Sequence, residues 1–356
     1  MTDPAFVALS LVPVHLWRHI GERLRTGEAP AAVLLRVLDE RWPIDVAARA
    51  DLVRRAEGIL ARAARASLES IPWSDPRYPI ALTTIADPPP VLWVRGCVAA
   101  LEGPAVGIVG ARAASAYALS VAERLAADLA ACGLTVVSGL ARGVDSAAHR
   151  GVVAAGGVTV AVLGCGVDVM YPPEHASLAR DIAKDGAVTS ELVPGTRPLP
   201  GFFPLRNRII SGLSRAIVVI EAGEKSGSLI TARCALDQGR DVLAVPGNVL
   251  SGRNRGAHGL LRDGATIVES ADDILEALGM ARQTDPPADA SRDGAAVAPS
   301  RPPDPILACL VPGEPSDLDA LAERSGLSPT RLLPRLFELE LQGVVRRVGG
   351  GRFVRV

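Results

Sequence analysis

The feature that most constrains the fold is a regular alternation of short apolar segments and helical segments between Pro104 and about Gly279. Seven apolar segments have the length of buried strands, and helical periodicity fills the intervals between them. Strands joined by crossover helices pair in parallel, and the helices cover both faces of the sheet. We therefore expect an α/β fold with a Rossmann-like, mainly parallel sheet. The predicted strands are 105–109, 134–137, 158–163, 187–190, 216–220, 242–245 and 266–268.

Different patterns flank this core. Residues 1–70 show helical spacing of apolar positions through 9–24, 31–38 and 47–68, and they predict a helical domain. Residues 71–103 form a proline-rich connecting segment that ends in a short strand at 91–94. Residues 281–303, rich in Ala, Pro, Asp and Ser, predict a disordered linker. Helices at 305–310, 318–325 and 329–342, followed by a hairpin, give residues 304–356 the element order of a winged helix.

Composition narrows the class of protein but not its ligand. The formal charge of the 356 residues is −1. The basic residues are 36 Arg and only 2 Lys, and a GC-rich coding bias explains this excess of arginine. Binding surfaces must therefore come from local placement of charge. The five scattered cysteines fit a reducing cytoplasm. With no leader after Met1 and no long apolar stretch, we expect a soluble cytoplasmic protein with no membrane contact.

Two glycine-containing turns follow predicted strands. The first, Val-Gly-Ile-Val-Gly-Ala-Arg, ends a strand at Gly110 and places Arg112 before a helix, where it can reach a phosphate. An ordinary βα turn with an exposed arginine is the alternative. The second turn runs from Ser138 to His149, and its successive N–H groups predict an anion nest in which Asp145 caps the next helix. The spacing of neither turn satisfies a dinucleotide fingerprint.

An arginine-rich segment, Phe-Phe-Pro-Leu-Arg-Asn-Arg, opens a further predicted helix. It places Arg206, Asn207 and Arg208 at the helix start, just after Pro204. Free N–H groups at a helix start attract anions, and guanidinium groups bind two phosphate oxygens in one plane. We therefore predict a phosphate site here, with Phe203 as a candidate for stacking on a base.

A fourth turn, from Glu221 to Thr231, joins another strand to a helix. It contains Ser226, Gly227 and Ser228, but no Walker A motif can be drawn through Lys225. Four phosphate sites along one sheet edge suit a run of successive phosphates in a single strand better than one mononucleotide. His15 and His19 lack the Glu of an H-E-x-x-H motif, and we predict neither a metal site nor a cofactor.

These motifs together resemble the DprA/Smf family (DNA-processing protein A). The resemblance covers about half of the chain and rests on four motifs: Gly110–Arg112, 138–145, 203–214 and 226–232. It implies that the first domain is SAM-like and that the last is a winged helix. It also implies a set of DNA-binding residues: Gly110, Arg112, Ser138, Gly139, Gly143, Phe203, Arg206, Asn207, Arg208, Ser226, Gly227 and Ser228.

The resemblance further implies a function. Members of the family bind single-stranded DNA, dimerise through the Rossmann-like domain, and deliver the strand to the RecA recombinase in natural transformation; they are not known as enzymes. Two alternatives remain at this point. One is a nucleotide-cleaving enzyme of the phosphoribohydrolase type, although the Glu of its P-G-G-x-G-T-x-x-E motif has no counterpart here. The other is a regulator that binds DNA through the winged helix.

Overall fold

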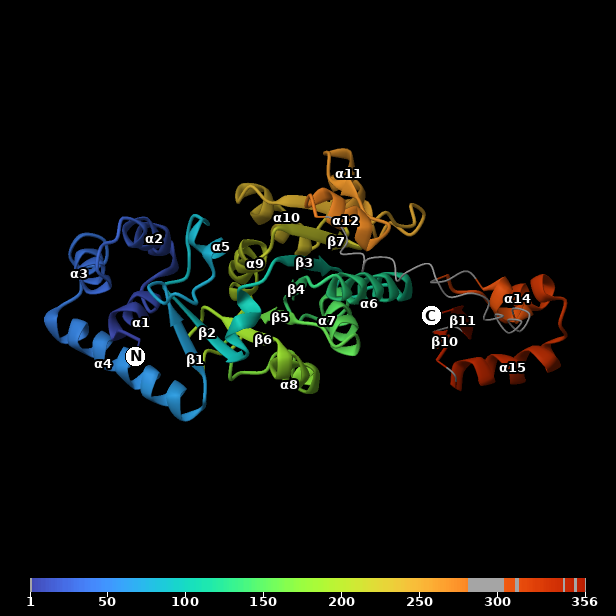
Figure 1. Ribbon diagram of the computed structural model, residues 1–356, viewed down its shortest axis with the longest axis horizontal. Coiled ribbons are helices and arrows are strands. Elements are labelled where there is room, and N and C mark those ends of the chain that lie inside the picture. The colour runs from blue at the N-terminus through green and yellow to red at the C-terminus, as the bar shows by residue number, and fades with distance from the viewer. Residues whose placement is uncertain (1, 281–303, 311–313, 342, 349–350, 356) are drawn as a thin grey trace, which may run out of the picture. The chain divides into compact units, whose positions relative to one another are not determined.

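The computed structural model describes residues 2–280, 304–310, 314–341, 343–348 and 351–355. Its centre is a nine-stranded sheet with the order β1-β2-β6-β5-β4-β3-β7-β8-β9 (Figure 1). The strands from β6 to β9 are parallel, and β1 and β2 are antiparallel at one edge. The predicted α/β fold class is confirmed. The strands are β1 (Glu69–Pro72), β2 (Val91–Gly96), β3 (Ala105–Gly110), β4 (Thr135–Ser138), β5 (Thr159–Val162), β6 (Ala187–Ser190), β7 (Ala216–Ile220), β8 (Asp241–Ala244) and β9 (Thr266–Ile267).

The order β5-β4-β3-β7-β8-β9 is that of a doubly wound Rossmann sheet. The chain leaves β3 in one direction toward β4, and it returns to the other side of β3 as β7. This reversal creates a topological switch point between the carboxyl ends of β3 and β7. Ligands bind at such points because the loops that leave the two strands diverge there.

All seven predicted strands of the core are present, with ends that differ by one residue at most. The strand β1 escaped prediction because Glu69-Ser-Ile-Pro72 is short and carries a proline. Proline is tolerated on an edge strand, where its missing N–H breaks no ladder bond. The predicted connecting segment 71–103 thus contributes to the sheet itself, since β2 pairs with both β1 and β6.

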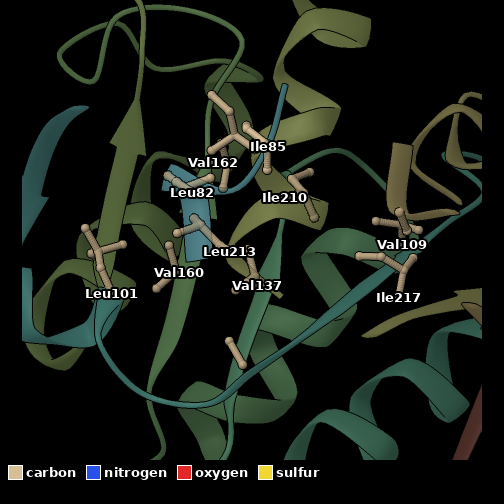
Figure 2. Packing of buried hydrophobic residues seen from close by; sticks show 14 of the residues in the cluster. Leu82, Ile85, Leu101, Val109, Val137, Val160, Val162, Ile210, Leu213 and Ile217 are labelled. Carbon is tan, nitrogen blue, oxygen red and sulfur yellow. The ribbon is translucent and has the colours of Figure 1, made fainter. Parts of the chain in front are cut away.

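Helices cover the sheet on both faces. Figure 2 shows Ile210 and Leu213 of α9 packed between the strand residues Val160 and Val162 and the segment that carries Leu82 and Ile85. The contacts are apolar and buried, so α9 is fixed against the sheet. These helices are α5 (Ile80–Thr83), α6 (Ala116–Ala131), α7 (Val144–Ala154), α8 (Ala176–Asp185), α9 (Phe202–Leu213), α10 (Ser228–Asp237), α11 (Arg255–Arg262) and α12 (Ala271–Ala277).

The amino-terminal region is helical as predicted, but the expected helix at 9–24 is wrong. The chain forms α1 (Pro4–Ser10), a short 3-10 turn (Val14–Leu16) and α2 (Trp17–Arg25) instead. Pro13 lies between them and cannot donate a helical hydrogen bond. The remaining helices are α3 (Pro30–Glu40) and α4 (Val46–Arg65). Val91 and Trp93 of β2 belong to the same buried cluster as these helices, so the two regions share a core.

The carboxyl-terminal region contains α13 (Pro305–Cys309), α14 (Leu318–Ser325), α15 (Pro329–Leu341) and the hairpin β10 (Val345–Val348) and β11 (Arg352–Arg355). Its own buried cluster includes Leu321, Leu336 and Phe353. The order of three helices and a hairpin matches the predicted winged helix. The predicted linker 281–303 and part of the predicted glycine turn lie outside the described residues.

Candidate nucleic-acid interface

The predicted motifs converge on one pocket at the switch point. Strands β4, β3, β7 and β8 are neighbours in the sheet, so the loops after them meet at a common edge. The pocket has a volume of about 760 Å³. It contains eight of the twelve predicted site residues: Gly110, Arg112, Phe203, Arg206, Asn207, Ser226, Gly227 and Ser228. The other four, Ser138, Gly139, Gly143 and Arg208, do not line it.

Gly110 is required by the close approach of two strands and a helix. A Cβ atom at this position would lie 1.9 Å from the carbonyl oxygen of Ile220 and 2.6 Å from Cγ2 of Val144. No other residue therefore fits without moving β7 or α7. The tight turn brings Arg112 to the pocket, with its side chain exposed.

Arg112 and two aromatic rings form the wall of the pocket. The guanidinium carbon of Arg112 lies 5.4 Å from the centroid of the Phe203 ring, within cation–π range. The centroid of the Tyr171 ring lies 5.5 Å from that of Phe203, with the ring planes inclined by 42°. Both rings are partly exposed. Sequence reasoning did not assign Tyr171, because its loop shows no motif and reaches the pocket only through the tertiary fold.

The loop after β4 is organised by Asp145. This buried carboxylate accepts hydrogen bonds from the N–H groups of Gly139 (3.1 Å) and Ala141 (3.4 Å). Burial raises the pKa of Asp145, and the nearby positive charge of Arg206 partly offsets this rise. The predicted anion nest is therefore occupied by the protein's own carboxylate. These two N–H groups are therefore not free to bind a phosphate, and the prediction that Asp145 caps the next helix is wrong, because the N-cap residue of α7 is Gly143.

Ser138, Gly139 and Gly143 support this loop. The hydroxyl of Ser138 is buried and donates to the carbonyl oxygen of Ile108 at 2.6 Å. Gly143 has φ of +78°, and a Cβ there would lie 2.2 Å from the carbonyl oxygen of Ala111. A Cβ at Gly139 would meet the guanidinium group of Arg206 at 2.4 Å. These residues shape the pocket from behind.

Arg206 and Asn207 lie in the second turn of α9, because the helix begins at Phe202 and not after Pro204 as predicted. The buried Arg206 donates through Nη1 to the carbonyl oxygens of Gly139, at 2.6 Å, and Val162. Burial lowers its pKa to about 10, which leaves the group charged at neutral pH. Nδ2 of Asn207 donates to the carbonyl oxygen of Gly227 at 3.3 Å and ties α9 to the start of α10.

Arg208 lies on the other side of α9. Its Nη2 donates to Oε2 of Glu191, its Nε lies 3.0 Å from Oδ2 of Asp87, and its guanidinium carbon is 5.7 Å from the centroid of the Trp17 ring. Burial raises the pKa of Glu191 to about 7 despite the nearby guanidinium. The arginine is only 6% exposed, and its Nη1 is buried with no hydrogen-bond partner among the described residues. This position does not fit the predicted contact with phosphate.

The start of α10 closes the pocket. Its first N–H groups donate within the turn itself: Ser228 to Oγ of Ser226, and Leu229 and Ile230 to the carbonyl oxygens of Ser226 and Gly227. The helix start carries partial positive charge. The hydroxyls of Ser226 and Ser228 are 2.7 Å apart, and Gly227 has no heavy atom within 4 Å of an added Cβ. Three cationic side chains, Arg112, Arg206 and Lys225, line the pocket against one carboxylate, Asp145. The pocket therefore has the charge and the donors to hold an anion.

Comparisons with known proteins show the family of the chain. Residues 69–279 match the family model described as DNA recombination-mediator protein A, and residues 285–351 match the model of the DprA winged helix domain. The chain belongs to the DprA family. Among its relatives, Protein Smf of Escherichia coli is 40% identical over 291 residues, which cover 80% of this chain and 77% of that protein. The DNA processing protein DprA of Streptococcus pneumoniae is 44% identical over 56% of this chain and 71% of its own length.

Solved structures of DprA proteins are also similar. The X-ray structure of DprA from Streptococcus pneumoniae gives a TM-score of 0.59 at 38% identity and covers 73% of this chain and 86% of that one. A structure of DprA from Helicobacter pylori, reported for its single-stranded DNA binding mode, gives 0.54 at 29% identity over 59% of this chain and 95% of that chain. The chain is therefore a DNA processing protein of the DprA family.

No group of three or more His, Cys, Asp or Glu residues in the described part of the chain has an arrangement that could hold a metal ion. None of the helices described is both long enough and apolar enough to span a membrane.

Proposed function

We propose that this DprA protein binds single-stranded DNA in the pocket between the loops after β3 and β7, and delivers the strand to RecA during recombination and natural transformation. The observation that supports this most is the exposed Arg112 stacked on Phe203, opposite the start of α10. One wall of the pocket thus offers a ring face and a guanidinium group, and the other offers the positively charged start of a helix. A nucleotide presents a matching pair of groups, a base and a phosphate.

The arrangement favours a single strand over a duplex. A base can stack on Phe203 or Tyr171 only when it is not already stacked within a double helix. In this proposal Arg112 and Lys225 contact phosphate oxygens, and the partial positive charge at the start of α10 attracts them. The buried Arg206 adds positive charge to the lining of the pocket, and Asn207 holds the turn at Gly227 in place through its hydrogen bond. Binding then depends on backbone and stacking rather than on sequence.

The proposed role is not catalytic. Asp145 is the one carboxylate among the residues that line the pocket, and it already accepts hydrogen bonds from two loop N–H groups. A general acid or base must be able to exchange a proton with the substrate. Incubation with nucleoside monophosphates should therefore release no free base. Release of base by the purified protein, and its loss in an Asp145→Asn variant, would support the phosphoribohydrolase alternative.

The binding proposal is tested by fluorescence anisotropy with labelled dT20 and with a duplex of the same length. We expect tighter binding of dT20, and a slope of log affinity against log salt of about −2 to −3, which corresponds to three or four neutralised phosphates. The exposed Arg180 on α8, replaced in Arg180→Ala, provides a control away from the pocket. Equal affinity for duplex, or binding without salt dependence, would contradict the proposal.

Delivery to RecA and dimerisation through the Rossmann-like domain complete the proposed function, and we place this activity in the cytoplasm, where both DNA and recombinase are found. Sedimentation of the free protein tests the dimer. RecA delivery is tested by the rate of RecA filament growth on a poly-dT single strand with and without this protein. We expect faster growth with the wild type and no acceleration with Arg112→Ala.

A further inference from the structure

A second positively charged hollow lies on the amino-terminal helices. Arg54, Arg55 and Arg62 of α4 line a concavity of about 600 Å³ together with the segment 193–196, which follows β6. All three arginines are exposed. No acidic side chain is among the described residues that line this hollow. It is therefore a positively charged surface separate from the pocket at the switch point.

The two surfaces are joined by one short loop. Thr196 lines the hollow, and Pro200 lines the pocket that contains Arg112 and Phe203. Four residues of fully extended chain span at most about 14 Å, so the two sites approach each other within that distance. Exposed Arg197 lies on the segment between them. An extended single strand covers this gap with roughly two or three nucleotides.

Gly58 is the second observation that indicates a ligand. It lies inside α4, one turn from both Arg54 and Arg62, and on the same face of the helix. Glycine inside a helix lowers stability relative to alanine. Packing does not require it here, because a Cβ would meet only the Nη1 atom of Arg62, at 3.6 Å. The missing side chain leaves room for a ligand to approach the helix backbone between the arginines.

We infer that this α4 surface, Arg54, Arg55, Gly58 and Arg62, binds the phosphodiester backbone of the single strand where it continues beyond the pocket. The inference rests on the proposed function, since the pocket fixes where the strand begins. Arg54 lies 3.2 Å from Asp51, but both side chains are more than half exposed. Such surface ion pairs are weak, so Arg54 can exchange its partner for a phosphate.

The test compares a short and a long oligonucleotide. The triple variant Arg54→Ala, Arg55→Ala and Arg62→Ala should bind dT20 about tenfold more weakly than the wild type, with a salt slope smaller in magnitude by about 2. Its affinity for dT4, which fills only the pocket, should not change. The double variant Arg36→Ala and Arg65→Ala removes two exposed arginines that lie outside the hollow, and should bind both oligonucleotides like the wild type.

A second variant separates binding from folding. Gly58→Ala should raise the urea midpoint of unfolding, since alanine favours helix, and should still weaken dT20 binding several-fold. If the wild type fails to bind dT4 or dT20, the proposed function itself fails. If the wild type binds both and the triple variant binds dT20 equally well, or loses dT4 to the same extent, this inference is overturned. Loss of RecA binding with unchanged dT20 binding would assign the surface to a protein partner.

Discussion

The two sides of helix α9 use the same kind of side chain for different purposes. Arg206 and Asn207 line the pocket at the switch point, whereas Arg208 faces Glu191, Asp87 and Trp17. The first side presents charge to a ligand. The second side joins the sheet, the segment before β2 and the amino-terminal helices through a buried ion pair.

This difference teaches that a run of basic residues on a helix cannot be assigned to one ligand. Residues two apart on an α-helix point about 200° away from each other, because each residue turns the helix by about 100°. Arg206 and Arg208 therefore could not both face the pocket. Arg206 lines the pocket, and Arg208 joins buried elements of the fold.

The largest expected effect is on the Arg208 side. Arg208→Ala should lower the free energy of unfolding by about 3–5 kcal/mol, because Glu191 is left buried without its partner. Urea denaturation measures this loss. The double variant Arg208→Leu and Glu191→Leu should recover much of it, since apolar groups replace both charges. A small loss of stability with a large loss of dT20 affinity would instead place Arg208 in the DNA site.

The same side should show a pH dependence. Burial raises the pKa of Glu191 from 4.5 to about 7, so between these values the folded protein holds a proton that the unfolded chain has released. The contribution of this group to stability is complete below pH 4.5 and is lost as the pH rises to 7, by at most about 1.4 kcal/mol per pH unit. Compared with Glu191→Gln, the wild type should lose about 2 kcal/mol between pH 5 and 8. Urea titrations at each pH measure it, and the opposite trend would contradict the assignment.

On the pocket side, Arg112→Ala should lower affinity for dT20 about tenfold, or about 1.4 kcal/mol, and reduce the salt slope by about 0.7. The free energy of unfolding should fall by no more than about 1 kcal/mol, because an exposed cation–π contact contributes little. Anisotropy and urea denaturation measure the two effects, with Arg180→Ala as the control. Unchanged affinity in Arg112→Ala would show that the DNA does not contact this wall of the pocket.

The smallest effect should come from Gly227→Ala, which reports how closely the strand approaches α10. A Cβ meets no atom of the chain within 4 Å, so we expect an affinity for dT20 lower by a factor of about 3 and nearly unchanged stability. Gly201→Ala is a matched control. Gly201 also precedes a helix, has similar backbone angles, and has the same free space, but it does not line the pocket. Equal affinities of the two variants would exclude close approach at Gly227.

The sequence predicted the sheet well because apolar runs of strand length report burial directly. Strands β6 and β7 have the predicted ends, 187–190 and 216–220. The position of the pocket also followed, since the carboxyl ends of parallel strands share one edge. Helix starts were less certain. The sequence predicts that α9 starts just after Pro204, but proline is equally acceptable in the first turn, and the helix begins at Phe202.

Side-chain partners were harder to predict than positions. Asp145 occupies the N–H groups of its own loop, and a motif alone cannot show whether such groups are free. Arg208 finds Asp87 and Trp17, which are distant in sequence and reach it only in the folded chain. Tyr171 joins Phe203 in the same way. Contacts of this kind depend on tertiary packing, which local patterns do not encode.

The core shared by the amino-terminal helices and β2 has a consequence for the evolution of the chain. A protein that begins at residue 104 would lack β1 and β2, and β6 would become an open edge of the sheet. The amino-terminal helices, separated from β2, would expose the apolar residues that pack against Val91 and Trp93. The helices are therefore not a freely exchangeable module, and a lineage that discards them must also rebuild the border of the sheet. Substitutions at Val91 or Trp93 should be tolerated only together with changes in the helices that cover them.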